Sequence, residues 1–207
     1  MNAQTQRRSI AGPAGAIECA VDVPATPARA LAVVCHPHPQ HGGTMDNKVV
    51  QTLARAFLQL GFEAVRFNFR GVGASQGAWA HGEGEVDDAR AVVDAFSRPG
   101  LPLMLAGFSF GGTVASRVAA DLAAAAPPVT CERLVLVAPA VSRFATPNVP
   151  AGSLVIHGEA DDVVPLASVL DWARPQGQPL TVIPGAGHFF HGQLSLLKSL
   201  VVAAWPR

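Results

Sequence analysis

The sequence has few of the features that mark a secreted or membrane-spanning protein. Its three cysteines, Cys19, Cys35 and Cys131, lie far apart and form no CxxC pair, so we expect no disulfide framework. It has no run of about eighteen apolar residues that could span a membrane. The segment behind Arg7 and Arg8 is too short and too broken for a secretory or twin-arginine signal. We therefore expect a cytoplasmic protein.

The formal net charge is zero, because 15 Lys and Arg residues balance 15 Asp and Glu residues. This balance gives no reason to expect nucleic acid or a membrane surface as a partner, although it leaves a local charged pocket open. The 207 residues are 49% apolar and only 14% charged, which is typical of a well-packed globular protein. We expect residues 1–207 to form a single domain.

Apolar, β-branched runs alternate with helical patterns along the chain. Strands are expected at 17–23, 31–35, 64–69, 103–106, 134–138, 154–157 and 180–184. Helices are expected at 48–60, 83–96, 114–125, 166–173 and 194–205. This alternation predicts an α/β fold with an open, mostly parallel sheet flanked by helices. Ligands bind such sheets beyond the carboxyl ends of the strands, where chemistry should be sought.

The first candidate for chemistry is the pentapeptide Gly107-Phe108-Ser109-Phe110-Gly111, which stands between an expected strand and an expected helix. A serine at the tip of such a sharp turn needs neighbours without side chains two residues before and after it. The turn would lift the Ser109 hydroxyl clear of the sheet and aim the Phe110 amide at a developing oxyanion. The alternative is a glycine-rich turn with an incidental serine.

A serine nucleophile needs a base and an orienting carboxylate. His188 follows the last expected strand on a glycine-rich turn and is the expected base, with His191 as a competitor inside the final helix. Asp161 follows the preceding strand and is the expected carboxylate. Asp162 suits a helix cap better, and Glu159 within the turn is a weaker candidate.

The chain order Ser109, Asp161, His188, with each residue after its own strand, is the order used by α/β-hydrolases. The chain resembles this superfamily from about Ile17 onward. It is most similar to small, lidless bacterial serine hydrolases. The motifs that carry the resemblance are NFRGVGAS at 68–75, His-Pro-His-Pro at 36–39 and Gly-Gly-Thr-Met at 42–45. The resemblance implies hydrolysis of esters or related acyl compounds without a cofactor, and it implies no particular substrate.

The His-rich loop lies where this fold places its second oxyanion donor. Pro37 and Pro39 have no N–H, so the donor nearest the strand end is His38, followed by Gln40. By resemblance to the family's usual donor we favour the backbone N–H of His38, paired with that of Phe110. This loop is not the His-Gly-Gly-Gly loop of lipases, so lipase specificity is not carried over.

A metal site is the alternative interpretation of the same loop. His36, His38 and His41 have a spacing that could bind a metal, but no cysteine pair or carboxylate nearby completes a ligand set. We therefore expect no metal.

Some residues are expected to line or support the site. Phe108, Phe144 and Phe189 are candidates for lining a substrate pocket, with ordinary packing as the alternative. Asp46 is expected to cap the helix at 48–60, and His157 to lie on the surface or in a turn. Only about fifteen residues separate the expected strands at 134–138 and 154–157, so no cap domain is expected over the site.

These observations predict a serine hydrolase, specifically a carboxylesterase for small or short-chain esters that works through an acyl-enzyme. A thioesterase or small peptidase would use the same chemistry, and a catalytically silent hydrolase fold that only binds ligands is the alternative of another class. The expected partner is a small-molecule ester, and a homodimer is a further possibility.

Overall fold

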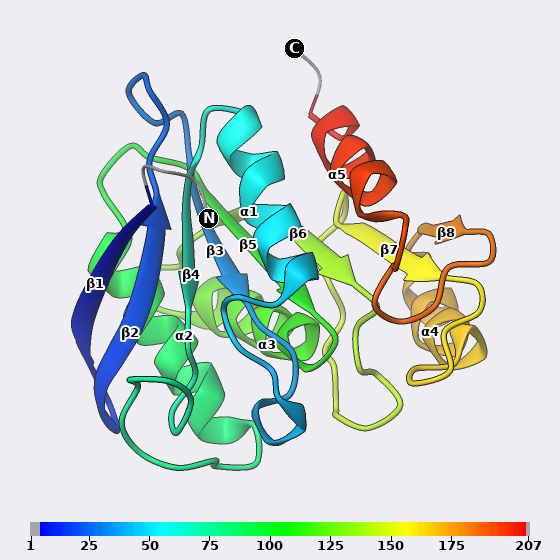
Figure 1. Ribbon diagram of the computed structural model, residues 1–207, viewed down its shortest axis with the longest axis horizontal. Helices are drawn as coiled ribbons and strands as arrows, with labels where there is room; N and C mark the ends of the chain where they lie inside the picture. Colours follow the sequence, from blue (N-terminus) through cyan, green and yellow to red (C-terminus); the bar gives the residue numbers. More distant parts are fainter. Residues whose placement is uncertain (1–4, 206–207) are drawn as a thin grey trace.

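The apolar runs of the sequence form one eight-stranded sheet in the computed structural model of the protein, which describes residues 5–205. The strand order is β1-β2-β4-β3-β5-β6-β7-β8 (Figure 1). Strands β1 and β2, and β2 and β4, pair antiparallel, whereas the pairs from β4 to β8 are parallel. The strands are β1 (Thr5–Gly12), β2 (Gly15–Asp22), β3 (Leu31–Cys35), β4 (Glu63–Phe67), β5 (Leu103–Phe108), β6 (Cys131–Val137), β7 (Leu154–Gly158) and β8 (Leu180–Ile183).

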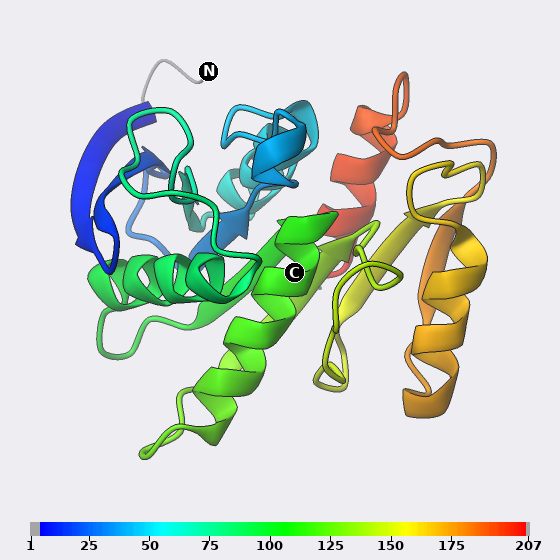
Figure 2. The same ribbon diagram turned by 90° about the horizontal axis from the view of Figure 1, so that it is seen from below.

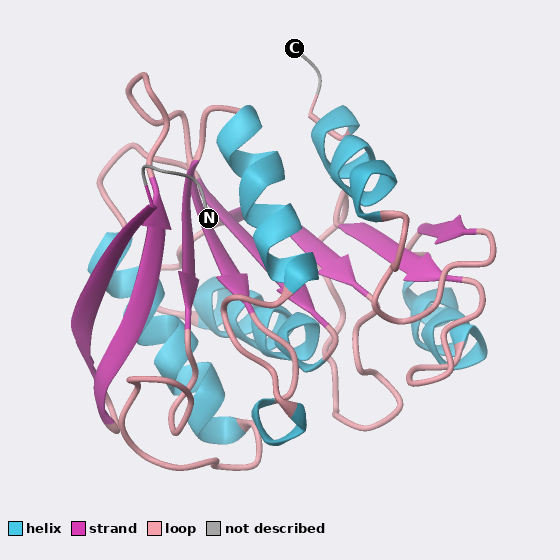
Figure 3. Ribbon diagram, viewed as in Figure 1, coloured by secondary structure: helices cyan, strands magenta, loops and turns pink. Residues whose placement is uncertain are grey.

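Helices cover both faces of the sheet, as a mostly parallel sheet requires. Helices α1 and α5 lie on one face, and α2, α3 and α4 lie on the other (Figures 2 and 3). The helices are α1 (Lys48–Gln59), α2 (Glu83–Phe96), α3 (Phe110–Ala124), α4 (Leu166–Ala173) and α5 (Leu194–Ala203), with short 3₁₀ helices at Pro39–His41 and Arg174–Gln176.

The continuous apolar character of β3 explains why it lies at the centre of the sheet. Leu31, Val33 and Cys35 point into the core shared with α2, α3 and α4. Ala32 and Val34, from the alternate positions, point into the core shared with α1 and α5. Because both faces are buried, the strand has no polar side and reads as an uninterrupted apolar run.

Two local expectations were wrong. Residues Thr5–Gly12 form β1, which pairs with β2 as a hairpin, although no strand was expected before residue 17. Helix α1 is capped by Asn47, whose side chain accepts hydrogen bonds from the amides of Val49 and Val50. Asp46 instead makes ion pairs with Arg7 and with the buried Arg66, which also pairs with Asp22.

The segment between β6 and β7 contains no helix or strand, so the described chain has no cap domain over the carboxyl ends of the strands. The expectation of a lidless fold is therefore confirmed. Within residues 5–205, no helix is long and apolar enough to cross a membrane.

Candidate active site

The candidate nucleophile lies on a strained turn between β5 and α3. Ser109 has a φ of 56° and a ψ of −121°, a conformation that a residue with a side chain seldom adopts. Its amide donates to the carbonyl of Val137 at 2.9 Å, which fixes the turn against β6. A Cβ on Gly107 would lie 2.0 Å from the carbonyl oxygen of Gly111, and a Cβ on Gly111 would lie 2.3 Å from that of Cys35. The turn can therefore form only with glycine at both positions.

Ser109, His188 and Asp161 form a hydrogen-bonded chain across the ends of three strands. The Ser109 hydroxyl lies 3.1 Å from His188 Nε2, and His188 Nδ1 lies 2.7 Å from Asp161 Oδ2. All three residues are buried, with exposures of 8%, 4% and 7% respectively. A carboxylate can only accept here, so Nδ1 carries the imidazole proton and Nε2 is free to accept the Ser109 proton.

The local backbone holds Asp161 in its ionised form. Its Oδ1 accepts hydrogen bonds from the amides of Val163 and Val164, at 2.9 and 2.7 Å. Burial by itself raises the pKa of Asp161, but the hydrogen bonds from His188 and Val164 outweigh it and leave the pKa below its usual range. An anionic Asp161 keeps His188 in the tautomer that can take a proton from serine.

The competing residues lie elsewhere. Glu159 accepts a hydrogen bond from the amide of Gly185 at 2.9 Å and so closes a loop. Asp162 is exposed, and it caps no helix, because α4 begins after Pro165. His191 is exposed in the turn before α5, not inside that helix as expected.

His157 contributes to the site although it was expected on the surface or in a turn. It is completely buried at the end of β7, and its Nε2–H donates to the carbonyl of Val164 at 2.9 Å. The same nitrogen lies 3.5 Å from Asp161 Oδ2, and burial lowers the pKa of the imidazole, which favours its neutral form. His157 thus supports the loop that positions Asp161. Its place at the end of an apolar strand was the signal that could have revealed its burial.

The His-rich loop brings His38 to the same cavity as Ser109 and Phe110. Its turn is closed by the amides of His41 and Gly43, which both donate to the carbonyl of His38. Within residues 5–205 the His38 amide itself has no hydrogen-bond acceptor. The Phe110 amide opens α3 and has no acceptor one helical turn earlier. Both amides are therefore available to a ligand.

The imidazole of His36 is occupied by the protein itself. Its Nδ1–H donates to the carbonyl of Pro37 at 2.6 Å, and its Nε2 accepts from the amide of Phe69 at 3.1 Å. Burial lowers the pKa of His36 to about 4. Neither His36 nitrogen is free to bind a metal, and the described part of the chain holds no group of three His, Cys, Asp or Glu residues suited to one.

Two small cavities meet at Ser109. One, of about 100 Å³, is lined by Phe110, Phe144, Arg143 and neighbouring residues, and the other, of about 140 Å³, is lined by His188, Phe189 and the His-rich loop. Phe144 and Phe189 thus lie where lining residues were expected. Phe108 instead lies fully in the core beneath His188, with ring centroids 4.9 Å apart.

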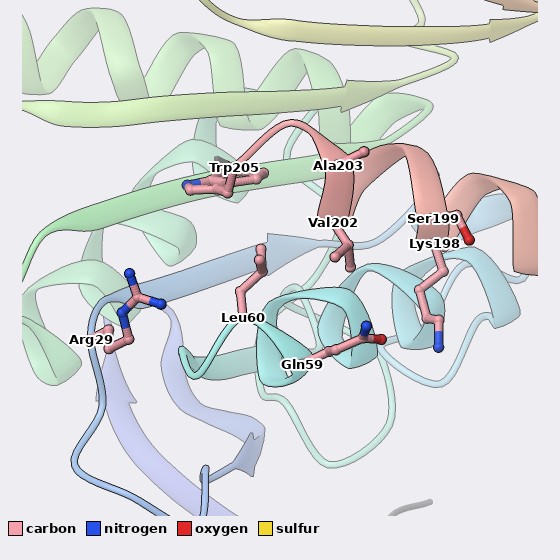
Figure 4. Close-up of a pocket in the computed structure, with 8 residues that line it drawn as sticks. All are labelled: Arg29, Gln59, Leu60, Lys198, Ser199, Val202, Ala203 and Trp205. Carbon is pink, nitrogen blue, oxygen red and sulfur yellow. The ribbon is translucent and has the colours of Figure 1, made fainter. Parts of the chain in front are cut away.

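A larger groove of about 600 Å³ lies away from this site, between the C-terminal ends of α1 and α5. Arg29 and Lys198 stand at its opposite ends (Figure 4). Arg29 precedes β3, so the groove lies near the amino ends of the parallel strands, whereas Ser109 follows a carboxyl end. The groove is therefore separate from the candidate active site.

Comparison with known proteins identifies the class of this fold and site. The family model described as serine aminopeptidase, S33, matches residues 26–151, more than half of the chain. The chain belongs to this family and thus to the α/β-hydrolase superfamily, so the resemblance seen in the sequence is confirmed.

Individual relatives support this family assignment. An uncharacterised protein of Rickettsia prowazekii is 32% identical over 196 residues, which cover 86% of this chain and 79% of that protein. A Xanthomonas campestris protein described as an α/β serine hydrolase without lid is 39% identical, with a TM-score of 0.86 over 99% of this chain and 94% of that one. An α/β serine hydrolase homologue from Coxiella burnetii is 38% identical, with a TM-score of 0.83 over 97% of both chains.

Proposed function

We propose that the protein is a serine carboxylesterase that cleaves small, short-chain esters. The observation that carries this proposal is the buried chain from Ser109 through His188 to Asp161, located where two small cavities meet. A serine hydroxyl with an oriented imidazole at hydrogen-bond distance is the arrangement that nucleophilic acyl transfer requires.

In the proposed mechanism Ser109 attacks the ester carbonyl while His188 takes its proton. The negative charge that develops on the carbonyl oxygen is stabilised by the amides of Phe110 and His38. The loss of one such donor typically raises the activation free energy by about 3 kcal/mol. His188 then returns the proton to the leaving alcohol. Water, activated by the same imidazole, releases the acid from Ser109.

A peptidase or thioesterase would use the same residues, and the family description itself names an aminopeptidase. An aminopeptidase must hold the α-ammonium group of its substrate, usually with a carboxylate. Neither cavity at Ser109 has an aspartate or glutamate among its described lining residues, and one contains Arg143. The charge of the site therefore favours an ester over a free amino terminus.

The decisive experiment compares p-nitrophenyl esters of increasing chain length on the wild type, Ser109→Ala and the exposed control Ser199→Ala. We expect activity on short chains, a loss of kcat of at least about 10³-fold in Ser109→Ala, and no change in the control. Equal rates in the wild type and Ser109→Ala would refute the proposal.

A fluorophosphonate probe separates the alternatives if no ester is cleaved. Labelling of Ser109 without ester turnover would indicate a peptidase or thioesterase, because the nucleophile would still be activated. Absence of both labelling and turnover would indicate a hydrolase fold that only binds ligands.

A further inference from the structure

Arg143 places a positive charge at the mouth of the candidate active site. It belongs to the irregular segment between β6 and β7, is exposed, and lines the 100 Å³ cavity together with Ser109 and His38. Within residues 5–205 its guanidinium has no ion pair and no hydrogen bond. Arg66, Arg70 and Arg117, by contrast, each bind a carboxylate.

The charge of Arg143 acts inside this cavity and is not balanced there. Arg143 and His38 line the same cavity. The pKa of His38 is lowered first by burial and then by the nearby His41 and Arg143. No described aspartate or glutamate lines the cavity. The nearby carboxylate of Asp161 is already hydrogen-bonded to His188 and to two amides.

The position of His188 indicates which part of a substrate would meet Arg143. The imidazole must protonate the leaving alcohol, so the alcohol lies on its side of Ser109. His188 lines the 140 Å³ cavity but not the cavity of Arg143. The acyl group would therefore occupy the cavity lined by Arg143. The other residues that line this cavity are mainly aromatic and aliphatic.

We propose that Arg143 selects esters whose acyl group carries a carboxylate a few atoms from the scissile carbonyl, that is, half-esters of short dicarboxylic acids. This inference rests on the esterase activity proposed above. A guanidinium can bind a carboxylate through two parallel hydrogen bonds, a geometry that a neutral acyl chain cannot use. The cavity volume of about 100 Å³ restricts the chain to a short one, such as a succinyl or glutaryl group.

The test compares mono-p-nitrophenyl glutarate with p-nitrophenyl valerate, which has the same chain length and no charge. The measured quantity is the ratio of kcat/KM for the anionic ester to that for the neutral ester. The variants are Arg143→Gln, the charge-preserving Arg143→Lys, and Arg29→Gln as a control, since Arg29 is an exposed arginine in the remote groove (Figure 4).

We expect the wild type to prefer the anionic ester, and the ratio to fall by about tenfold or more in Arg143→Gln, mainly through KM. Arg143→Lys should retain part of the preference, and Arg29→Gln all of it. Added salt should raise KM for the anionic ester in the wild type but have a smaller effect in Arg143→Gln.

A wild-type preference for the neutral ester, or a ratio unchanged in Arg143→Gln, would overturn the role of Arg143 while leaving the esterase proposal intact. Failure of the esterase proposal would look different, because neither ester would then be cleaved in a Ser109-dependent manner.

Discussion

Replacing Asp161 by asparagine should abolish the proposed base function of His188 while preserving the fold. Asp161 Oδ1 is held by the amides of Val163 and Val164, so the carbonyl oxygen of an asparagine must take that place. The asparagine NH₂ group then occupies the position of Oδ2, 2.7 Å from His188 Nδ1. An NH₂ group donates, so Nδ1 must accept, and the imidazole proton moves to Nε2. The Nε2–H then points at Ser109 and cannot take its proton.

The expected loss follows from this exchange of tautomers. A wrong imidazole tautomer in a serine hydrolase lowers kcat by about 10⁴-fold, which corresponds to about 5 kcal/mol of activation free energy. The hydrogen bonds to both backbone amides remain, so the free energy of unfolding should change by only about 1 kcal/mol or less. The loss of activity should therefore appear in kcat and not in the folded fraction.

The assay is kcat on a short p-nitrophenyl ester, together with urea unfolding of the same preparations. Asp162→Asn is the matched control, since Asp162 is exposed and adjacent in sequence. A kcat for Asp161→Asn within tenfold of the wild type would refute the assignment. A comparable loss in Glu159→Gln would move the orienting role to that residue.

Two further predictions concern stability. Arg70→Met should lower the free energy of unfolding by about 3–5 kcal/mol in urea, because it leaves the buried Asp88 carboxylate without its ion pair. If the double variant with Asp88→Leu had as low a free energy of unfolding as Arg70→Met alone, this prediction would be contradicted. The pKa of His36 is about 4 in the fold and 6.5 as its ordinary value, so below pH 6.5 the unfolded chain binds the additional proton. The free energy of unfolding should therefore fall by up to about 3 kcal/mol between pH 6.5 and 4, and His36→Gln should flatten this slope; equal slopes would refute it.

The sequence was sufficient to predict the parallel part of the sheet, because strands buried on both faces appear as uninterrupted apolar runs. Strand β1 was missed because it is not buried on both faces and therefore forms no such run. It lies at the edge of the sheet, most of its residues are exposed, and its sequence TQRRSIAG has no apolar alternation. Its pairing with β2 comes from backbone hydrogen bonds, which the side-chain pattern does not record.

The sequence predicts those residues of the candidate site that directly follow a strand. Ser109, Asp161 and His188 each follow a strand of the sheet, so topology alone brings them to one edge. His157 and Arg143 could not be assigned in this way. The burial of His157 follows from its place in an apolar strand, but its contact with the loop of Asp161 depends on how that loop folds back over it. Arg143 lies in a segment with no periodic pattern.

This irregular segment is nevertheless hydrogen-bonded directly to the turn of Ser109. The Ser109 amide donates to Val137, and the Ser109 carbonyl accepts from the amide of Ala140 at 3.2 Å. The amide of Arg143 in turn donates to the carbonyl of Ala140 at 3.0 Å. Two consecutive backbone hydrogen bonds thus set the position of Arg143 relative to the turn of Ser109. The selective side chain proposed at Arg143 would in this way be held beside the candidate nucleophile without a cap domain, because the strained turn and the segment that carries the arginine support each other.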